Sequence, residues 1–188
     1  SISQMLSFLE IKKGPFDSKD TIFPEWGPEE GDSVSVKKYL NNLGAIMARK
    51  IEVIHTADRD SSMNLPYAPT IKVTGGSLLF LAGVTAAKVY HNHPHIESEF
   101  DDIPEGVSEQ TRMALENVKK GLEAGGGTFS DIVQVTRFLT DIDQQDELNE
   151  VWWEYFGDHR PGTATIEVSR LAAHPKLKIE LSAIAVVD

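Results

Sequence analysis

The order of secondary-structure elements that this sequence predicts is typical of an α+β protein, in which helices cover one face of a mixed β-sheet. In the second half of the chain, apolar residues recur at helical spacing in two segments and alternate with other residues in three more. These segments follow one another in the order helix, strand, helix, strand, strand. The strands are expected at residues 131–139, 163–169 and 177–187.

Each of the two predicted helices has an apolar stripe and recognisable ends. Ser108 is a good N-cap for the first, and the glycines at 125–127 end it. Asp143 or Asp146 is expected to cap the second. The stripes consist of Ala114, Leu115, Val118 and Leu122 in the first helix, and of Leu148, Val151, Trp152, Tyr155 and Phe156 in the second. Because only one of two adjacent helical residues can face inward, the pair Trp152–Trp153 indicates packing rather than a stacking platform.

The first half of the chain predicts three strands and one helix. Strands are expected at residues 49–57, 67–73 and 78–83, with residues 74–77 as a short glycine-containing hairpin connection between the last two. A helix is expected at residues 33–47, although Gly44 disfavours it. The proline- and glycine-rich start of the chain is typical of an arm that packs on the domain or on a neighbouring subunit. We therefore expect an N-terminal extension at 1–60 and one domain at 61–188.

Composition excludes several classes of function. The chain has 188 residues, a formal net charge of −11 and no cysteine. The negative charge disfavours nucleic acid and anionic membrane surfaces as partners. Without cysteine there are no disulfides, thiol nucleophiles or cysteine-ligated metals. The absence of cysteine fits a reducing cytoplasm, where the chain is expected. Its start has no basic region before an apolar core, so we expect no secretory signal. No apolar run reaches the ~20 residues that a membrane span needs.

A long loop at residues 85–106 contains three histidines spaced by two, His91, His93 and His95, followed by several acidic residues. Neutral imidazole is a common metal ligand. The loop setting and Pro94 leave the geometry of the histidines undefined, so a polar loop with pH-sensitive charge is the alternative. We expect no metal and no cofactor in the functional site.

From residue 66 to residue 187 the chain resembles the RidA/YjgF family of small homotrimeric proteins. The order and spacing of several short pieces carry the resemblance. These are Pro66-Tyr67, 71–73 and 79–83 in the opening strands, Gln110-Thr111, 115–118 and 122–126 in the first helix, 138–141 and Asn149 in the next strand and helix, and 167–171, 178–181 and 183–185 near the C-terminus.

The resemblance implies a chorismate-mutase-like two-layer sandwich, three copies of which form a barrel with clefts between subunits. Enzymatic members of the family hydrolyse reactive enamines and imines, such as 2-aminoacrylate, without a cofactor. A small-molecule substrate would therefore bind in the inter-subunit cleft. The residues of this chain that the resemblance places in the cleft are Tyr67, Gly83, Asn149, Thr163, Thr165 and Glu180.

One departure from the family pattern concerns substrate binding. Family deaminases have an arginine two residues after a proline, where it pairs with the substrate carboxylate. This chain has Thr163 at that position. A threonine hydroxyl cannot form the two charge-assisted hydrogen bonds of a guanidinium, so 2-aminoacrylate itself is not the expected substrate. Arg160, Arg137 or a residue of the arm is a candidate replacement, and Arg160 is alternatively a solvated surface residue.

Two functions remain open at this point. In a hydrolase, the Glu180 carboxylate would act as general base and then acid, and the backbone N–H of Thr165 would stabilise developing charge. Alternatively, Glu180 is a solvated strand residue facing Lys176 or Lys178, and the threonines reflect strand propensity alone. The protein would then be a non-catalytic, trimeric ligand-binding or regulatory protein of the same fold.

Overall fold

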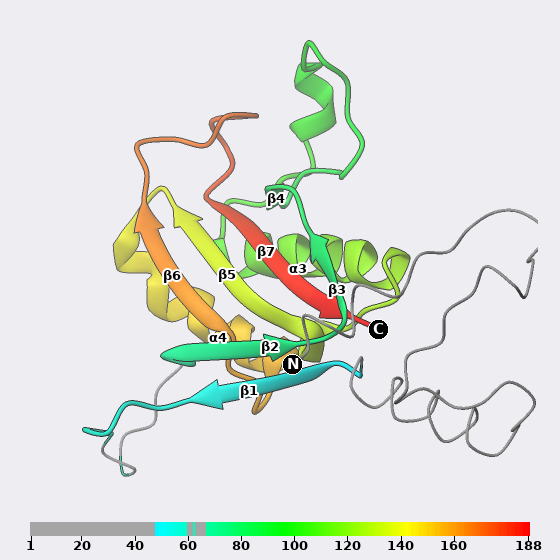
Figure 1. Ribbon diagram of the computed structural model, residues 1–188. Helices are drawn as coiled ribbons and strands as arrows, with labels where there is room; N and C mark the ends of the chain where they lie inside the picture. The colour runs from blue at the N-terminus through cyan, green and yellow to red at the C-terminus, as the bar shows by residue number, and fades with distance from the viewer. Residues whose placement is uncertain (1–47, 60–61, 63–66) are drawn as a thin grey trace, which may run out of the picture. The chain divides into compact units, whose positions relative to one another are not determined.

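A computed structural model of the protein describes residues 48–59, 62 and 67–188. Its central element is a five-stranded mixed sheet with the strand order β3-β7-β5-β6, in which β4 also pairs with β7 (Figure 1). β5 and β6 are parallel, and the other pairs are antiparallel. The strands comprise β3 (Ser77–Phe80), β4 (Val84–Thr85), β5 (Ile132–Leu139), β6 (Gly162–Glu167) and β7 (Ile179–Val187).

Two helices, α3 (Val107–Ala124) and α4 (Gln145–Phe156), cover one face of this sheet (Figure 1). α4 connects the parallel strands β5 and β6, as a crossover between parallel strands requires. The core between the layers contains both predicted apolar stripes and every second residue of β7, among them Ile179, Leu181 and Ala183. The α+β prediction is therefore confirmed, with two helices on one face of a mixed sheet.

Trp152 is buried in this core with 1% of its surface exposed, whereas Trp153 is only partly buried. The prediction that one of the two tryptophans packs inward is therefore confirmed. The indole of Trp152 stacks on Phe156 at a centroid distance of 4.0 Å. Trp153 instead lies under the guanidinium of Arg160, 4.0 Å from the ring centroid.

The predicted hairpin between the first two strands of the domain is wrong. β2 (Thr70–Thr74) pairs with β1 (Lys50–Ile54) in a separate two-stranded antiparallel sheet, whereas β3 pairs with β7. Gly75 and Gly76, with φ of 69° and 73°, let the chain leave one sheet and enter the other. A side chain on Gly76 would also meet Val186 at 2.7 Å, so the turn leaves no space for one.

The helix starts differ from the predicted caps by a few residues. α3 begins at Val107 with Gly106 at the N-cap position, so Ser108 lies inside the helix. A short 3-10 helix, η4 (Ile142–Gln144), precedes α4, and Asp141 caps it by accepting a hydrogen bond from the N–H of Asp143. The cap is therefore neither Asp143 nor Asp146. The end of α3 is as predicted, because the N–H of Gly127 bonds to the carbonyl of Leu122 at 2.8 Å after Gly126 takes a positive φ.

Buried polar side chains of α3 hold the long loop that follows β4. The Asn117 amide donates to the carbonyls of Thr85 and Ala87 at 3.1 and 2.8 Å. Gln110 donates to the carbonyls of Pro104 and Lys176 at 2.7 and 2.8 Å. The loop contains the 3-10 helix η2 (Glu97–Phe100), whose Phe100 is buried in a second apolar cluster. The two ends of the loop are thus fixed to the core.

The helix predicted at 33–47 lies outside the described residues. None of the helices in the described part of the chain combines the length and the apolar character that crossing a bilayer requires.

Candidate functional site

Arg137 is a buried arginine in the middle of β5. Residues of a strand alternate between its two faces, and Arg137 lies on the same face as the buried Val135 and Leu139. That face is the one that the helices cover. Only 6% of the surface of Arg137 is exposed, which is unusual for a charged residue and demands hydrogen-bond partners.

The partners of Arg137 are two residues that the sequence analysis assigned to the cleft. Its Nε and Nη2 donate to the hydroxyl oxygen of Thr165 at 2.9 and 2.6 Å, and its Nη1 donates to Oδ1 of Asn149 at 2.8 Å. The guanidinium also lies over the ring of Trp152, 5.0 Å from the centroid. Register explains the contact with Thr165, because Arg137 and Thr165 are direct neighbours in the parallel β5-β6 ladder.

These hydrogen bonds determine which donor groups of Thr165 and Asn149 point away from Arg137. A guanidinium only donates, so the Thr165 oxygen acts as an acceptor and its own hydroxyl hydrogen points elsewhere. By the same reasoning Oδ1 of Asn149 faces Arg137, which leaves the two N–H groups of Nδ2 directed away from it. Among the described residues, neither the Thr165 O–H nor Asn149 Nδ2 has an acceptor. Arg137 therefore presents two neutral donors for an acceptor group of a ligand.

The charge of Arg137 is not neutralised within the described part of the chain, where no carboxylate pairs with it. Burial lowers the pKa of Arg137 to about 10. The guanidinium is still charged at neutral pH. A buried cation without a counterion favours an anion nearby. Such an anion would bind at the Thr165 hydroxyl and the Asn149 amide, which Arg137 orients.

The second group of predicted site residues consists of Glu180 on β7 and Gly83 before β4. The backbone of Gly83 lies so close to Glu180 that a Cβ atom there would be 2.3 Å from the carboxylate Oε1. A side chain at position 83 would therefore displace the carboxylate. Within the described residues no group forms a hydrogen bond with the Glu180 carboxylate, so both of its oxygens are available to a ligand or water.

The two groups lie on opposite faces of the sheet. Arg137 is paired with Leu181 across the β5-β7 ladder, so both side chains lie on the helix-covered face. Glu180 precedes Leu181 and points to the other face, opposite Phe138. One chain therefore does not bring Glu180 together with Thr165 and Asn149.

A family model described as endoribonuclease L-PSP matches residues 60–187 of this chain. The chain belongs to this family. A RutC family protein of Pyrococcus horikoshii is 38% identical over 136 residues, which cover 71% of this chain and 96% of the relative. The putative reactive intermediate deaminase TdcF of Escherichia coli is 37% identical over 86 residues, which cover 44% of this chain and 67% of TdcF.

Solved structures agree with this assignment. The structure of E. coli TdcF with bound serine matches with a TM-score of 0.50 and 32% identity over 60% of this chain and 83% of TdcF. A Thermotoga maritima protein described as a putative endoribonuclease matches with the same TM-score and 35% identity, over 62% of this chain and 84% of the other. The RidA/YjgF resemblance and the two-layer α+β fold are thereby confirmed.

The structure places the remaining predicted site residues around the start of β6. The Thr163 hydroxyl donates to the carbonyl of Pro161 at 3.1 Å, so this side chain is engaged with the neighbouring backbone. Arg160 donates to the carbonyls of Gly157 and His159 at 2.6 and 3.1 Å, beyond the end of α4. Tyr67 is 42% exposed and lies next to Ala68, whose N–H bonds to the Pro161 carbonyl at 3.1 Å.

Sequence reasoning named Arg137 only as one of several replacements for the family arginine. A stronger signal was present. In the alternation of β5, a charged residue stands at an inward position between Val135 and Leu139, where the apolar alternation predicts an apolar residue. An arginine at such a position requires polar partners on the neighbouring strand and helix, and Thr165 and Asn149 supply them.

Proposed function

We propose that this protein is an enamine/imine deaminase, a hydrolase that adds water to the C=N bond of a small, anionic reactive intermediate and releases ammonia. The observation that carries the proposal is the pair of donors, Thr165 and Asn149, which the buried cation Arg137 orients away from itself. The family resemblance assigns both residues to the cleft. Similarity to TdcF, which bears the name of a putative reactive intermediate deaminase, supports the reaction class.

The chemistry needs one acid–base group and a place for the substrate's charge. Water adds to the carbon of the protonated imine while the Glu180 carboxylate accepts one proton from it, and the neutral carbinolamine forms. The protonated carboxyl then gives this proton to the nitrogen. As the C–N bond breaks and ammonia leaves, the carboxylate accepts the hydroxyl proton of the carbinolamine, the carbonyl forms, and the proton passes to solvent. An enamine enters at the same step after it tautomerises to the imine. A positioned carboxylate contributes about 10²–10⁴-fold to such proton transfers.

The donors define the class of substrate. The Thr165 hydroxyl and the Asn149 amide suit the oxygens of a carboxylate, and the charge of Arg137 favours an anion beside them. Thr163 is smaller than the arginine of the family pattern, and its hydroxyl is bonded to Pro161. The cleft therefore has room for an acid larger than 2-aminoacrylate but lacks the direct two-point grip on a carboxylate that a surface guanidinium provides.

The complete site requires a second copy of the chain, because Glu180 and Thr165 lie on opposite faces of one sheet. We assign the protein a homotrimeric assembly in which Gly83 and Glu180 of one copy face Thr165 and Asn149 of the next. Large apolar side chains on the helix-free face are exposed in a single chain, which supports this assembly. They include Leu78, Phe80 and Ile166, with 62%, 67% and 44% of their surfaces exposed.

The reaction is tested by ammonia release from imino acids that an amino-acid oxidase generates in situ, over a series from alanine to phenylalanine. We expect faster release with the native protein, most clearly for the larger acids. Glu180→Gln should lower the enzymatic rate about 100-fold or more. Glu123→Gln makes the same chemical change at an exposed position of α3 and should leave the rate unchanged. Equal rates for the native protein and Glu180→Gln would contradict the proposal.

The shared cleft is tested by mixing two inactive variants. Glu180→Gln and Thr165→Val remove opposite halves of the same site. If each cleft takes one half from each of two neighbouring chains, trimers reassembled from an equal mixture contain about a quarter of clefts with both halves intact. The mixture should then recover about a quarter of native activity. If each chain had a complete site of its own, no activity would return.

The non-catalytic alternative is favoured by one observation, the threonine at the position of the family arginine. In that case a keto acid such as phenylpyruvate would bind in calorimetry, whereas the imino acids would be hydrolysed no faster than in buffer. Faster hydrolysis of any imino acid by the native protein than by Glu180→Gln would exclude this alternative.

A further inference from the structure

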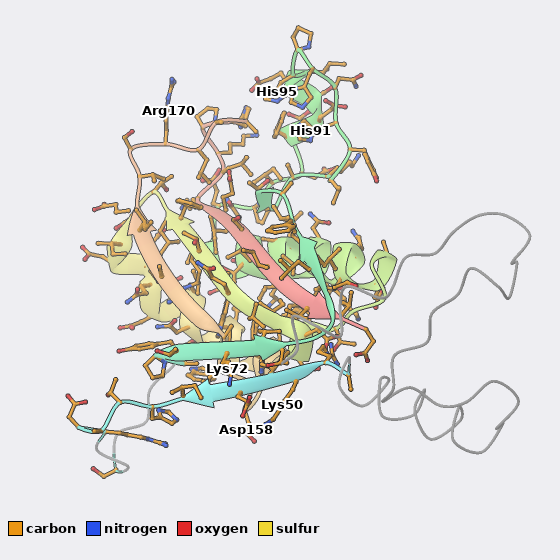
Figure 2. The ribbon with its side chains drawn as sticks, viewed as in Figure 1. Lys50, Lys72, His91, His95, Asp158 and Arg170 are labelled. Carbon is orange, nitrogen blue, oxygen red and sulfur yellow. The ribbon has the colours of Figure 1, made fainter. Side chains whose placement is uncertain are left out.

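Three histidines gather on the segment that follows β4. His91, His93 and His95 each offer a ring nitrogen, and these nitrogens lie within 4.8 Å of one another. The ring centroids are 4.5–5.1 Å apart. Figure 2 shows His91 and His95 together on this segment. We infer that the three imidazoles bind a divalent transition-metal ion, with Zn²⁺ as the ion that fits the ligands best.

His91 supplies the deciding observation. Its Nδ1 lies 2.9 Å from the carbonyl oxygen of Lys88. A carbonyl only accepts, so Nδ1 carries the proton and, in the neutral ring, Nε2 keeps its lone pair. That Nε2 is buried and has no hydrogen-bond partner among the described residues. A buried polar atom without a partner is rare and costly, and a metal ion would satisfy it.

The hydrogen bond at Nδ1 is also the one that a metal-binding histidine normally makes. Ligand imidazoles usually donate their second N–H to a backbone carbonyl or a carboxylate, which fixes the tautomer and the ring orientation. His91 already has this arrangement. His93 and His95 are exposed, so their side chains have room to rotate.

The distances allow the site to close. Nitrogens bound to tetrahedral zinc at about 2.1 Å lie about 3.4 Å from one another. The present limit of 4.8 Å therefore requires a movement of about 1.4 Å, which a side-chain rotation of the two exposed histidines supplies.

The segment around the histidines is built to hold them in place. The Glu99 carboxylate accepts hydrogen bonds from the backbone N–H and the side-chain amide of Asn92, at 3.0 and 2.7 Å. The buried ring of Phe100 contacts His91 and His95 edge-on, with centroids 5.8 and 5.6 Å away. The edge-on contacts with Phe100 explain why the rings of His91 and His95 lie close together. It does not explain the unpartnered Nε2 of His91.

Charge and ligand type select the ion. The segment after the histidines contains acidic but no basic residues over positions 96–102, which raises the local concentration of cations. Three imidazoles suit Zn²⁺, Cu²⁺ and Ni²⁺, whereas Mg²⁺ and Ca²⁺ prefer oxygen ligands. Three protein ligands leave a fourth position of the tetrahedron for water.

The test uses the full chain without a histidine tag, stripped with a chelator and titrated with Zn²⁺ in a calorimeter. We expect one ion per chain. His93→Ala and His95→Ala should each weaken binding at least tenfold, whereas His55→Ala, which removes an exposed histidine outside the cluster, should leave it unchanged. Because His93 and His95 are exposed, we expect both variants to fold normally, and circular dichroism would check this.

A second readout is thermal stability. Because an ion that binds only the folded state stabilises it, Zn²⁺ should raise the Tm of the native protein and of His55→Ala but not of His93→Ala. Absence of binding, or an affinity that either His93→Ala or His95→Ala leaves unchanged, would overturn the three-histidine site.

Discussion

Replacing Arg137 by methionine separates the functional role of this residue from a structural one. Methionine keeps most of the side-chain volume next to Trp152 but removes the guanidinium. The hydroxyl of Thr165 and the amide of Asn149 then lose the donor that orients them. We expect Arg137→Met to bind and hydrolyse anionic substrates poorly while it folds about as stably as the native protein.

The expected stability follows from two opposing effects. Burial lowers the pKa of Arg137 to about 10, which corresponds to a desolvation cost of about 3 kcal/mol for the charged form relative to a solvated guanidinium. Methionine removes this cost. It also leaves the oxygens of Thr165 and Asn149 without their donors, at about 1–3 kcal/mol. The two effects nearly cancel, so the free energy of unfolding should change by about 1 kcal/mol or less.

The pKa of Arg137 also predicts the direction of a pH effect. Its folded pKa lies below the unfolded value, so the unfolded chain binds more protons between pH of about 10 and 12.5. The contribution of Arg137 is therefore unfavourable at neutral pH and is relieved only above pH of about 10. At neutral pH an anion bound beside it relieves part of the same cost.

Two measurements on Arg137→Met and the native protein test this reasoning. Urea unfolding at neutral pH gives the free energy of unfolding of both. Titration with phenylpyruvate, followed by the shift in Tm, gives ligand stabilisation. We expect similar unfolding free energies and a Tm shift in the native protein alone. Arg160→Met, at the other predicted arginine, should keep the Tm shift.

One result would refute the functional role. If Arg137→Met lost several kcal/mol of stability and still bound the keto acid as tightly as the native protein, the arginine would serve only to hold β5, β6 and α4 together. The orientation of the two donors would then have no consequence for the ligand.

Three further substitutions probe the packing of the site and the core. Gly83→Ala places a Cβ atom on the Glu180 carboxylate, so we expect imine hydrolysis to fall at least tenfold with little change in Tm. Trp152→Ala empties a fully buried site and should cost about 3–5 kcal/mol in urea unfolding, whereas Trp153→Ala should cost clearly less. Asp131→Ala removes a capping box and the ion-pair partner of the partly buried Arg49, and the Tm should fall by an amount equivalent to about 1–3 kcal/mol.

Local patterns were sufficient to predict most elements of the fold. The stripes of α3 and α4 became the helical side of the core, and the glycines after α3 ended it as expected. These features depend on residues close together in sequence. Strand pairing does not. The partner of β2 is β1 and that of β3 is β7, and nothing in the short glycine connection distinguishes this arrangement from a hairpin.

The site was predicted less completely because its geometry is non-local. The resemblance placed Asn149, Thr165 and Glu180 in one cleft, but register assigns Glu180 to the other face of the sheet. The role of Arg137 depends on a neighbour in a parallel strand 28 residues away. The metal site at the histidine cluster could not be inferred without the tautomer of His91, which the carbonyl of Lys88 in the folded loop determines.

The strand β6 shows how these findings depend on one another. Its alternation is inverted, because Thr163 and Thr165 face the helical layer while Ala164 and Ile166 face outward. Strands that cover a core normally turn their apolar side inward. Arg137 accounts for the inward threonine at position 165, since a buried guanidinium needs an oxygen there. The outward apolar side has no partner within the described chain, and a second copy would cover it. The inversion thus places the hydroxyl of Thr165 on the helix-covered face. On the other face it exposes apolar side chains, which favour the proposed contact with a second copy that would complete the site.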